Sequence, residues 1–328
     1  MRKILLTTTA LVALGGVSAA SALDISGFQR FEYQSWDDVG VETNGANDTQ
    51  MVDFNRVVFT HEITGDSGLE ASGYYRINDW AEAYHGIGVQ TDLGHFGFGN
   101  WWTAGGFMYN SHLYNGTFRS GTGQTFTGVA TSAAATIVDA GDNSVNYTMP
   151  TVAGGLDAMV TMSDAGTASA ADVTEVFVAY SGAAGGDATF RLHGGIVEGD
   201  DSTGTADDEQ ENTEYGLNVD SGAFGFRMTR EEATTKTAST GVSSAKIETN
   251  EYAVTYAMSD DLTLGLIQLD SNDKLATGTP KLDMTVIAAN YFIMPGLRVQ
   301  ASTVSFDYET GGVVNDGSSM NVALRIDF

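Results

Sequence analysis

Apolar and polar residues alternate with a period of two along most of this chain. The last segment shows it clearly, with apolar residues at Met320, Val322, Leu324, Ile326 and Phe328. Successive side chains of a β-strand point to opposite faces, so this period predicts strands with one apolar and one polar face. The alternation therefore predicts an all-β fold.

The connections between the alternating segments differ in length. Residues 65–68, 259–261 and 295–296 are short turn signals, whereas other connections are long, polar and acidic: 37–50, 199–212, 233–247 and 272–283. Short connections on one rim and long connections on the other favour an antiparallel up-and-down sheet, because parallel strands need crossover helices. We expect sixteen strands, near residues 23–36, 51–64, 69–78, 84–91, 95–102, 143–149, 155–164, 173–181, 188–198, 213–220, 223–232, 248–258, 262–271, 284–294, 297–309 and 318–328.

Residues 1–22 are typical of an export signal. Arg2 and Lys3 precede an apolar run from Ile4 to about Val17, and Ala20-Ser21-Ala22 forms a small-x-small cleavage site. The run is shorter than the ~20 residues of a membrane-spanning helix, although a retained anchor is the alternative. We expect cleavage after Ala22, which leaves a mature chain of residues 23–328.

Composition excludes several classes of protein. The formal charge is −27, and removing Arg2 and Lys3 with the signal brings it to −29. Nucleic-acid binding needs clustered Lys and Arg, and the chain has only 15 of these residues against 42 Asp and Glu. Disulfides, zinc fingers and thiol chemistry are excluded because the chain has no cysteine. G-x-S-x-G, H-E-x-x-H, Walker A and Rossmann motifs are absent, and the five histidines lack metal-ligand spacing. The sequence therefore predicts no enzyme, no cofactor and no nucleic-acid partner.

Apolar and polar residues alternate along the strands of both soluble and membrane barrels, but only the membrane barrel has an apolar outside and a polar interior. Seven arginines occupy the polar phase: Arg30, Arg56, Arg76, Arg191, Arg227, Arg298 and Arg325. Aromatic residues share the apolar phase, many near strand ends, as in the girdles of outer-membrane barrels: Phe31, Tyr33, Tyr147, Tyr180, Tyr252, Tyr256, Tyr291 and Phe328. We therefore expect a closed transmembrane β-barrel, since hydrocarbon tolerates no unpaired strand edge. A secreted β-lectin and an outer-membrane hydrolase are remote alternatives.

Several segments, in their order and spacing, resemble the trimeric general porins of Gram-negative outer membranes in their alphaproteobacterial form. They are Leu23–Gly27, Asn55–Phe59, Gly65–Leu69, Asp92–Gly99, Asp142–Tyr147 and Val322–Phe328. The resemblance implies a sixteen-stranded homotrimer surrounded by lipid and lipopolysaccharide of the outer membrane. It also implies a long third loop folded into the lumen and a terminal Phe328 that the barrel-assembly machinery reads.

The constriction loop is expected at about residues 103–142, the longest stretch without alternation. Such loops commonly carry acidic residues, but residues 100–138 contain no Asp or Glu. Arg119 and His112 lie within that stretch, and Asp139 is the first acid after it. The charge of this loop therefore departs from the family pattern. Its aromatic residues either pack the loop against the wall or form a track for a specific solute.

Arg30, Arg56 and Arg76 lie on three consecutive strands in the polar phase, which predicts a basic patch on the lumenal wall. The resemblance places such a patch opposite the third loop, so these three residues, with Arg119, His112 and Asp139, are the candidate constriction. The alternative is that each arginine pairs with a lumenal carboxylate such as Glu32 or Glu70. The mature charge of −29 concentrates cations at the mouth and predicts weak cation selectivity.

The acidic stretch between residues 198 and 214 offers carboxylates for a structural calcium ion at the rim, with Asp200, Asp201, Asp207 and Asp208 as candidates. It lacks the spacing of an EF-hand, so a solvated loop is the alternative. Altogether the sequence predicts an outer-membrane porin for passive diffusion of ions and small hydrophilic solutes. A substrate-specific uptake channel is the nearest competing function.

Overall fold

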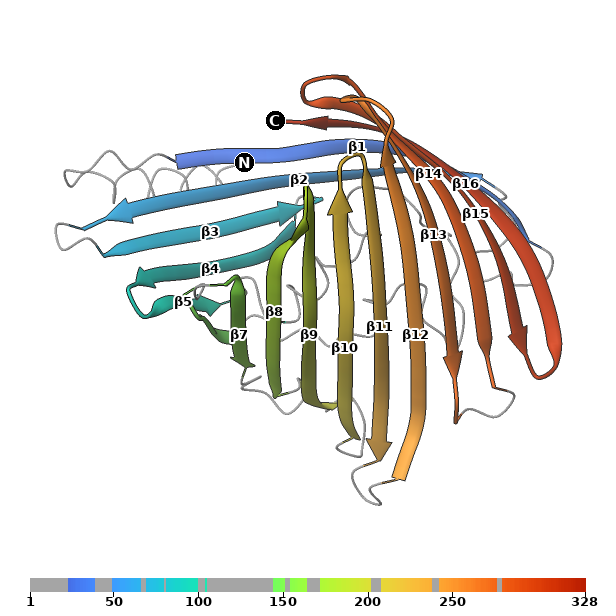
Figure 1. Ribbon diagram of the computed structural model, residues 1–328, viewed down its shortest axis with the longest axis horizontal. Coiled ribbons are helices and arrows are strands. Elements are labelled where there is room, and N and C mark those ends of the chain that lie inside the picture. The colour runs from blue at the N-terminus through green and yellow to red at the C-terminus, as the bar shows by residue number, and fades with distance from the viewer. Residues whose placement is uncertain are drawn as a thin grey trace.

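Sixteen antiparallel strands close into one barrel (Figure 1). This computed structural model describes residues 23–38, 49–65, 69–79, 81–99, 104, 144–150, 154–163, 172–201, 208–237, 242–275 and 279–328. The strands are β1 (Leu23–Asp38), β2 (Thr49–Thr64), β3 (Glu70–Asn78), β4 (Ala81–Thr91), β5 (Gly94–Gly99), β6 (Ser144–Thr148), β7 (Leu156–Ser163), β8 (Val173–Gly185), β9 (Ala188–Asp201), β10 (Asp208–Ser221), β11 (Phe224–Thr237), β12 (Val242–Ala257), β13 (Leu262–Asp273), β14 (Lys281–Met294), β15 (Leu297–Thr310) and β16 (Val313–Asp327). Within the described ranges, no helix is long and apolar enough to cross a membrane.

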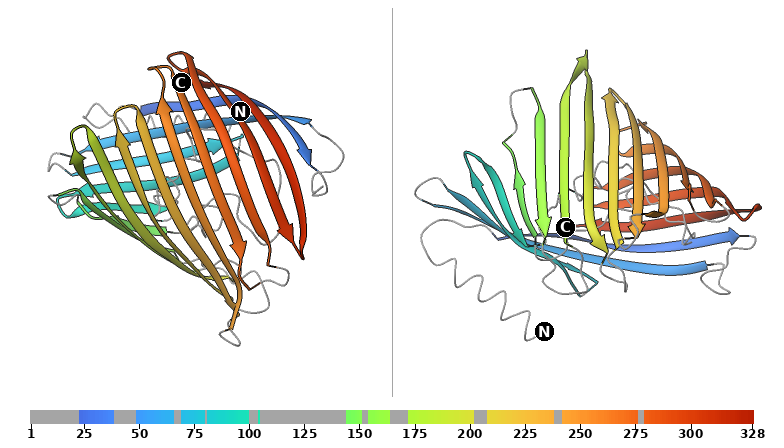
Figure 2. Two further views of the ribbon diagram at one scale, coloured as in Figure 1. Left: turned by 45° about the vertical axis from the view of Figure 1, so that its right-hand side comes forward. Right: turned by 90° about the horizontal axis from the view of Figure 1, so that it is seen from below.

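Each strand pairs with its neighbours in sequence, and β1 also pairs with β16, so the strands follow one another around the wall (Figure 2). Two backbone hydrogen bonds complete the seam: Gly27 N–H donates to the Phe328 carbonyl at 2.8 Å, and Phe328 N–H donates to the Gly27 carbonyl at 3.1 Å. Closure removes the free strand edges, whose unpaired N–H and C=O groups hydrocarbon cannot satisfy.

The predicted number and order of strands are confirmed, but several strands are longer than expected at the end with the long connections. β9 extends to Asp201, β11 to Thr237 and β13 to Asp273. The connections expected at 199–212, 233–247 and 272–283 are therefore shorter than predicted. Both faces of these extensions carry polar residues, so the alternation disappears from the sequence although the hydrogen-bonded ladder continues.

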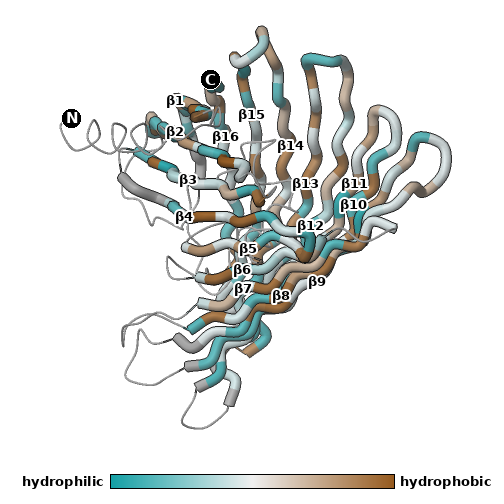
Figure 3. The backbone as a smooth tube through the Cα atoms, turned by 90° about the vertical axis from the view of Figure 1, so that its left-hand side faces the viewer, coloured by the Kyte–Doolittle hydropathy of each residue, from teal (hydrophilic) through white to brown (hydrophobic). Residues whose placement is uncertain are grey.

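The outward face carries the exposed apolar side chains. Figure 3 shows how hydrophobic and hydrophilic residues alternate along the strands. Outward aromatic residues gather near the end with the short turns: Tyr180, Phe224, Tyr256, Tyr291 and Phe328, all well exposed. Such a belt matches the aromatic girdle at a membrane border. The expected apolar exterior is thus present.

The inward face is less uniformly polar than expected. Apolar side chains of β12–β15 form a buried cluster on this face: Ala253, Ile267, Leu269, Leu282, Met284, Val286, Ala288, Val304, Phe306 and Tyr308. The outward neighbours at the same level are polar, including Gln268, Asp283 and Asp307. At this level of the sector, the apolar side chains therefore lie on the inward face and polar side chains lie on the outward face.

Candidate functional site

A row of arginines occupies the inward face around the seam of the barrel. Arg30 on β1, Arg56 on β2 and Arg76 on β3 all share the inward phase, as the sequence predicted. Arg325 on β16 is the register partner of both Arg30 and Arg298 on β15. These five residues form what we call the basic wall. Arg298 and Arg325 were absent from the predicted constriction, because only closure of the barrel brings β15 and β16 beside β1.

Aromatic rings support the basic wall. Phe28 and Phe54 stack with their centroids 5.5 Å apart. The Arg325 guanidinium lies 3.8 Å from the centroid of Phe28, and that of Arg30 lies 5.3 Å from the centroid of Phe54. The Arg56 guanidinium is within 5.6 Å of both rings. Cation–π attraction therefore holds these cations against the wall.

Carboxylates compensate the basic wall unevenly. Arg30 pairs with Glu32 at 3.4 Å. Asp327 pairs with Arg325 at 2.6 Å and with Arg298 at 3.2 Å. The sequence offered as an alternative that each arginine pairs with a lumenal carboxylate, and the structure shows such a pair for Arg30 and Glu32.

Arg56 and Arg76 differ from the other three arginines. Arg56 Nε donates to Asn78 Oδ1 at 3.2 Å, and the Arg76 guanidinium lies 4.0 Å from the centroid of Tyr84. No carboxylate in the described part of the chain, Glu70 included, pairs with either of them. Their two positive charges are therefore the uncompensated part of the basic wall.

The inward face about half a turn away carries buried carboxylates, which we call the acidic wall. They are Glu175 on β8, Glu214 on β10, Glu231 on β11 and Glu251 on β12, each no more than 2% exposed. Glu214 and Glu231 are direct register partners. These glutamates were absent from the predicted constriction, although each occupies the inward phase of its strand. The basic and acidic walls therefore place side chains of opposite formal charge on opposite parts of the inward face.

A histidine lies within the acidic wall. His193 Nε2 on β9 is 3.4 Å from Glu214 Oε1, and both side chains are fully buried. The ring packs over Gly216 on β10, where a Cβ atom would lie 2.5 Å from two ring atoms. Glycine is therefore required at this position for the histidine to reach the glutamate.

The predicted loop residues Arg119, His112 and Asp139 lie outside the described residues, as does nearly all of the expected constriction loop 103–142 and all of the signal 1–22. Ala104 is the exception. Its N–H donates to Thr161 Oγ1 on β7 at 2.8 Å, and it packs in a buried cluster with Met159 and Phe177. All three partners are on the inward face, so Ala104 lies inside the barrel.

The calcium prediction stays a prediction. Asp200 and Asp201 end β9 and Asp208 begins β10, with Asp201 and Asp208 as register partners. The structure describes the side chains of none of these residues, and Asp207 lies outside the described ranges. Among the side chains that are described, no group of three or more His, Cys, Asp or Glu residues is arranged to hold a metal ion.

A family model described as Gram-negative porin matches residues 7–311. The chain belongs to this family. A search of curated protein sequences finds no match. The porin fold also recurs in solved structures, among them the outer-membrane OmpT of Vibrio cholerae, with 18% identity and a TM-score of 0.72, covering 95% of this chain and 99% of that one.

Two further porin structures support the same fold. The anion-selective porin of Comamonas acidovorans has 14% identity and a TM-score of 0.73, covering 94% of this chain and all of that one. A mutant porin of Rh. blastica has 16% identity and a TM-score of 0.63, with the same coverage. The predicted porin family and sixteen-stranded barrel are confirmed. This porin is an outer-membrane diffusion channel, and its family and fold indicate a channel rather than an enzyme.

Proposed function

We propose that this porin is weakly selective for cations as it passes ions and small hydrophilic solutes. The charge of −29 on the mature chain attracts cations to the mouth. The basic wall opposes this effect inside the bore, because Arg56 and Arg76 have no carboxylate partner among the described residues. The uneven compensation of the basic wall is the observation that keeps the proposed preference weak.

Single-channel recording in a planar bilayer tests the proposal. In a KCl gradient, the reversal potential is expected to lie on the cation-selective side, by a small margin. A reversal potential of the opposite sign would show that the basic wall, rather than the net charge, controls selectivity. Absence of channels would contradict the diffusion function itself.

The competing function is a substrate-specific channel. Liposomes that contain the protein are expected to swell at rates that fall smoothly with the size of neutral sugars, because a general pore sorts by radius. A single sugar that permeates faster than smaller ones would favour the specific channel. Purified protein is also expected to be inert in esterase and phospholipase assays, and activity there would favour the hydrolase.

We further propose that the protein works as a homotrimer, in contact with lipid and lipopolysaccharide, after insertion by the barrel-assembly machinery. Support for the trimer comes from the fold, since one similar structure, OmpT of Vibrio cholerae, is described as a trimer form. Chemical cross-linking in membranes is expected to yield a trimer. If calcium binds at the β9–β10 rim, chelation is expected to lower the melting temperature of that trimer; an unchanged temperature would dispose of the calcium site.

A further inference from the structure

The outward face of β11–β14 changes from apolar to charged at one level. On β12, Tyr252 and Val254 are followed toward the long connections by Asn250, Glu248 and Lys246 in the same phase. On β11, the apolar Met228 is followed toward the long connections by Arg230 and Glu232 on the same face. Met228 pairs with Tyr252, and Arg230 pairs with Asn250, so the border runs continuously from strand to strand. It marks the end of the lipid-facing band.

The lysines of the chain are concentrated just beyond this border. Apart from Lys3 in the signal, the chain has four lysines: Lys236, Lys246, Lys274 and Lys281. Each lies on β11, β12 or β14 or directly follows β13. The lysines are therefore concentrated on one sector of the outer surface, although the mature chain has a charge of −29.

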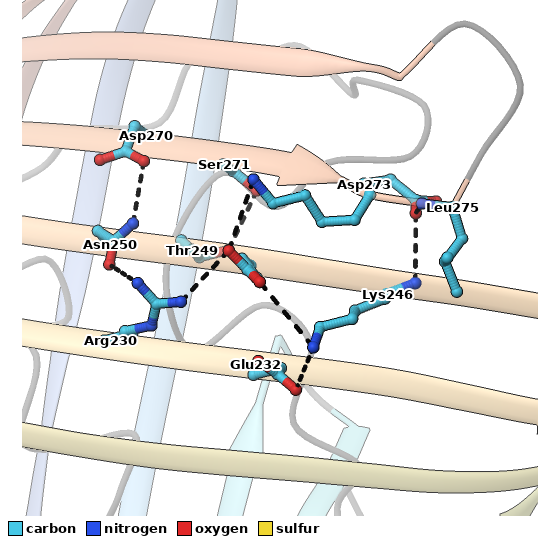
Figure 4. Close-up of polar contacts among 11 residues, drawn as sticks. Arg230, Glu232, Lys246, Thr249, Asn250, Asp270, Ser271, Asp273 and Leu275 are labelled. Carbon is cyan, nitrogen blue, oxygen red and sulfur yellow. Dashed lines mark hydrogen bonds and ion pairs between the residues drawn. The ribbon is translucent and has the colours of Figure 1, made fainter. Parts of the chain in front are cut away.

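Residues of β11 and β12 and the residue directly after β13 build one compact ionic cluster, of which Figure 4 labels Arg230, Glu232 and Lys246. Glu248 forms ion pairs with Arg230 at 3.3 Å, with Lys274 at 3.6 Å and with Lys246 at 4.0 Å. Lys246 also pairs with Glu232 at 2.8 Å. We call Arg230, Glu232, Lys246, Glu248 and Lys274 the Glu248 cluster.

The Glu248 cluster has a surplus of positive charge that faces outward. It contains three cations and two carboxylates, and its central carboxylate is only 18% exposed. A further carboxylate on this face, Asp270, accepts a hydrogen bond from Asn250 at 3.0 Å. The side chains of Arg230, Lys246 and Lys274 are 37%, 34% and 49% exposed. Each lysine ammonium has three N–H donors, so donors remain for an acceptor that approaches from outside. Lys274 N–H also donates to the Lys246 carbonyl at 2.9 Å, which fixes the two lysines side by side.

We propose that the Glu248 cluster binds the phosphate group of a lipid headgroup. A phosphate offers several charged oxygens that can bridge adjacent cations, and basic residues at a membrane border attract anionic lipids. The apolar side chains of Tyr252, Val254 and Met228 directly below the cluster suit the acyl portion of the same molecule. The inference rests on the proposed contact with outer-membrane lipid and assigns a site to it.

The test measures lipid-dependent stabilisation of the purified full-length barrel in an uncharged detergent. The probe is bisphosphorylated lipid A in mixed micelles, with dephosphorylated lipid A and inorganic phosphate as separate arms. Ligand that binds only the folded barrel raises its unfolding temperature. Lipid A is expected to raise it for the wild type. The double variant K246Q/K274Q is expected to need about tenfold more lipid A for half the effect, because two cations are lost.

Two variants control for unrelated effects. Lys236 lies on the same face, is equally exposed, and pairs one-to-one with Glu211, so K236Q is expected to respond like the wild type. K246R/K274R retains both charges and is expected to restore the response, which separates binding from misfolding. Equal responses of K246Q/K274Q and wild type would overturn the proposal, as would no response of the wild type. Equal effects of dephosphorylated lipid A or of inorganic phosphate at the same concentration would also overturn it. Channel conductance of the wild type, measured separately, reports on the proposed function alone.

Discussion

At the scale of single residues, the basic wall shows how adjacent cations coexist with few carboxylates. The faces of Phe28 and Phe54 contact the guanidiniums of Arg30, Arg56 and Arg325. A guanidinium can stack through its plane and still present N–H groups at its edge. The aromatic rings therefore fix the positions of the cations on the inward face and leave N–H groups at the guanidinium edges for other partners.

The uncompensated arginines are expected to influence selectivity most. Replacing Arg56 and Arg76 together by Gln removes two positive charges that no described carboxylate balances. The double variant is expected to become more cation-selective than the wild type. The reversal potential in a tenfold KCl gradient measures the change.

Arg191→Gln provides the comparison for this prediction. Arg191 also faces inward, but it pairs with Asp157 at 3.7 Å on the β7–β9 side of the barrel. Its replacement is expected to shift the reversal potential less per charge removed. Equal shifts per charge at both places would mean that net charge alone, and not the basic wall, sets selectivity.

Gly216 is expected to be intolerant of a side chain. In Gly216→Ala, the new methyl group would lie 2.5 Å from the His193 ring and 2.6 Å from the Met228 carbonyl oxygen. Overpacking of this kind costs about 1–3 kcal/mol of unfolding free energy. Urea unfolding followed by tryptophan fluorescence measures the loss.

Gly73→Ala serves as the matched substitution, because a Cβ atom at Gly73 on β3 meets nothing within 4 Å. This variant is expected to unfold like the wild type. If the two glycine variants are equally stable, the close packing of His193 on Gly216 does not contribute to stability.

At the scale of strands, the seam between β1 and β16 depends on the last residue. Phe328 exchanges two backbone hydrogen bonds with Gly27 and exposes its ring on the outward face. Deleting Phe328 removes both hydrogen bonds and the residue that the resemblance assigns to barrel assembly. The amount of heat-modifiable, folded barrel in outer membranes is expected to fall severely.

Refolding in detergent separates the two roles of Phe328. The deleted chain is expected to refold in vitro to a substantial yield, because eleven register pairs still join β1 and β16. Ile326→Ala, which leaves the terminus intact, is expected to assemble normally in cells. Normal assembly of the deletion variant would remove Phe328 from the assembly signal.

The strands also show what the sequence can and cannot reveal. Within the lipid band, each strand has one apolar face, so the alternation located β13 and β15 almost to the residue. Beyond the band both faces are polar, and the ends of β9, β11 and β12 went unrecognised for that reason. The basic wall was found in part because Arg30, Arg56 and Arg76 lie on consecutive strands. Arg298 and Arg325 required the closure of the barrel, which is a contact between the two ends of the chain.

At the scale of the whole molecule, charge is distributed in three separate zones. The basic wall lies at the seam on β15, β16 and β1–β3, and the acidic wall lies on β8 and β10–β12. Most other acidic residues belong to the strand extensions and long connections, which bring the total to −29. We expect the first two zones to act on an ion inside the lumen and the third to act at a distance on ions that approach the mouth.

This difference in range predicts how selectivity depends on salt. The Debye length is ~30 Å at 0.01 M salt and ~3 Å at 1 M, so salt screens the charge of the mouth before it screens contacts within the lumen. The cation preference is expected to be largest at 0.01 M and to vanish by 1 M, measured as the reversal potential at a constant tenfold KCl gradient. If the preference is the same at all salt concentrations, short-range contacts with the lumenal walls control it, and the −29 charge of the mature chain does not.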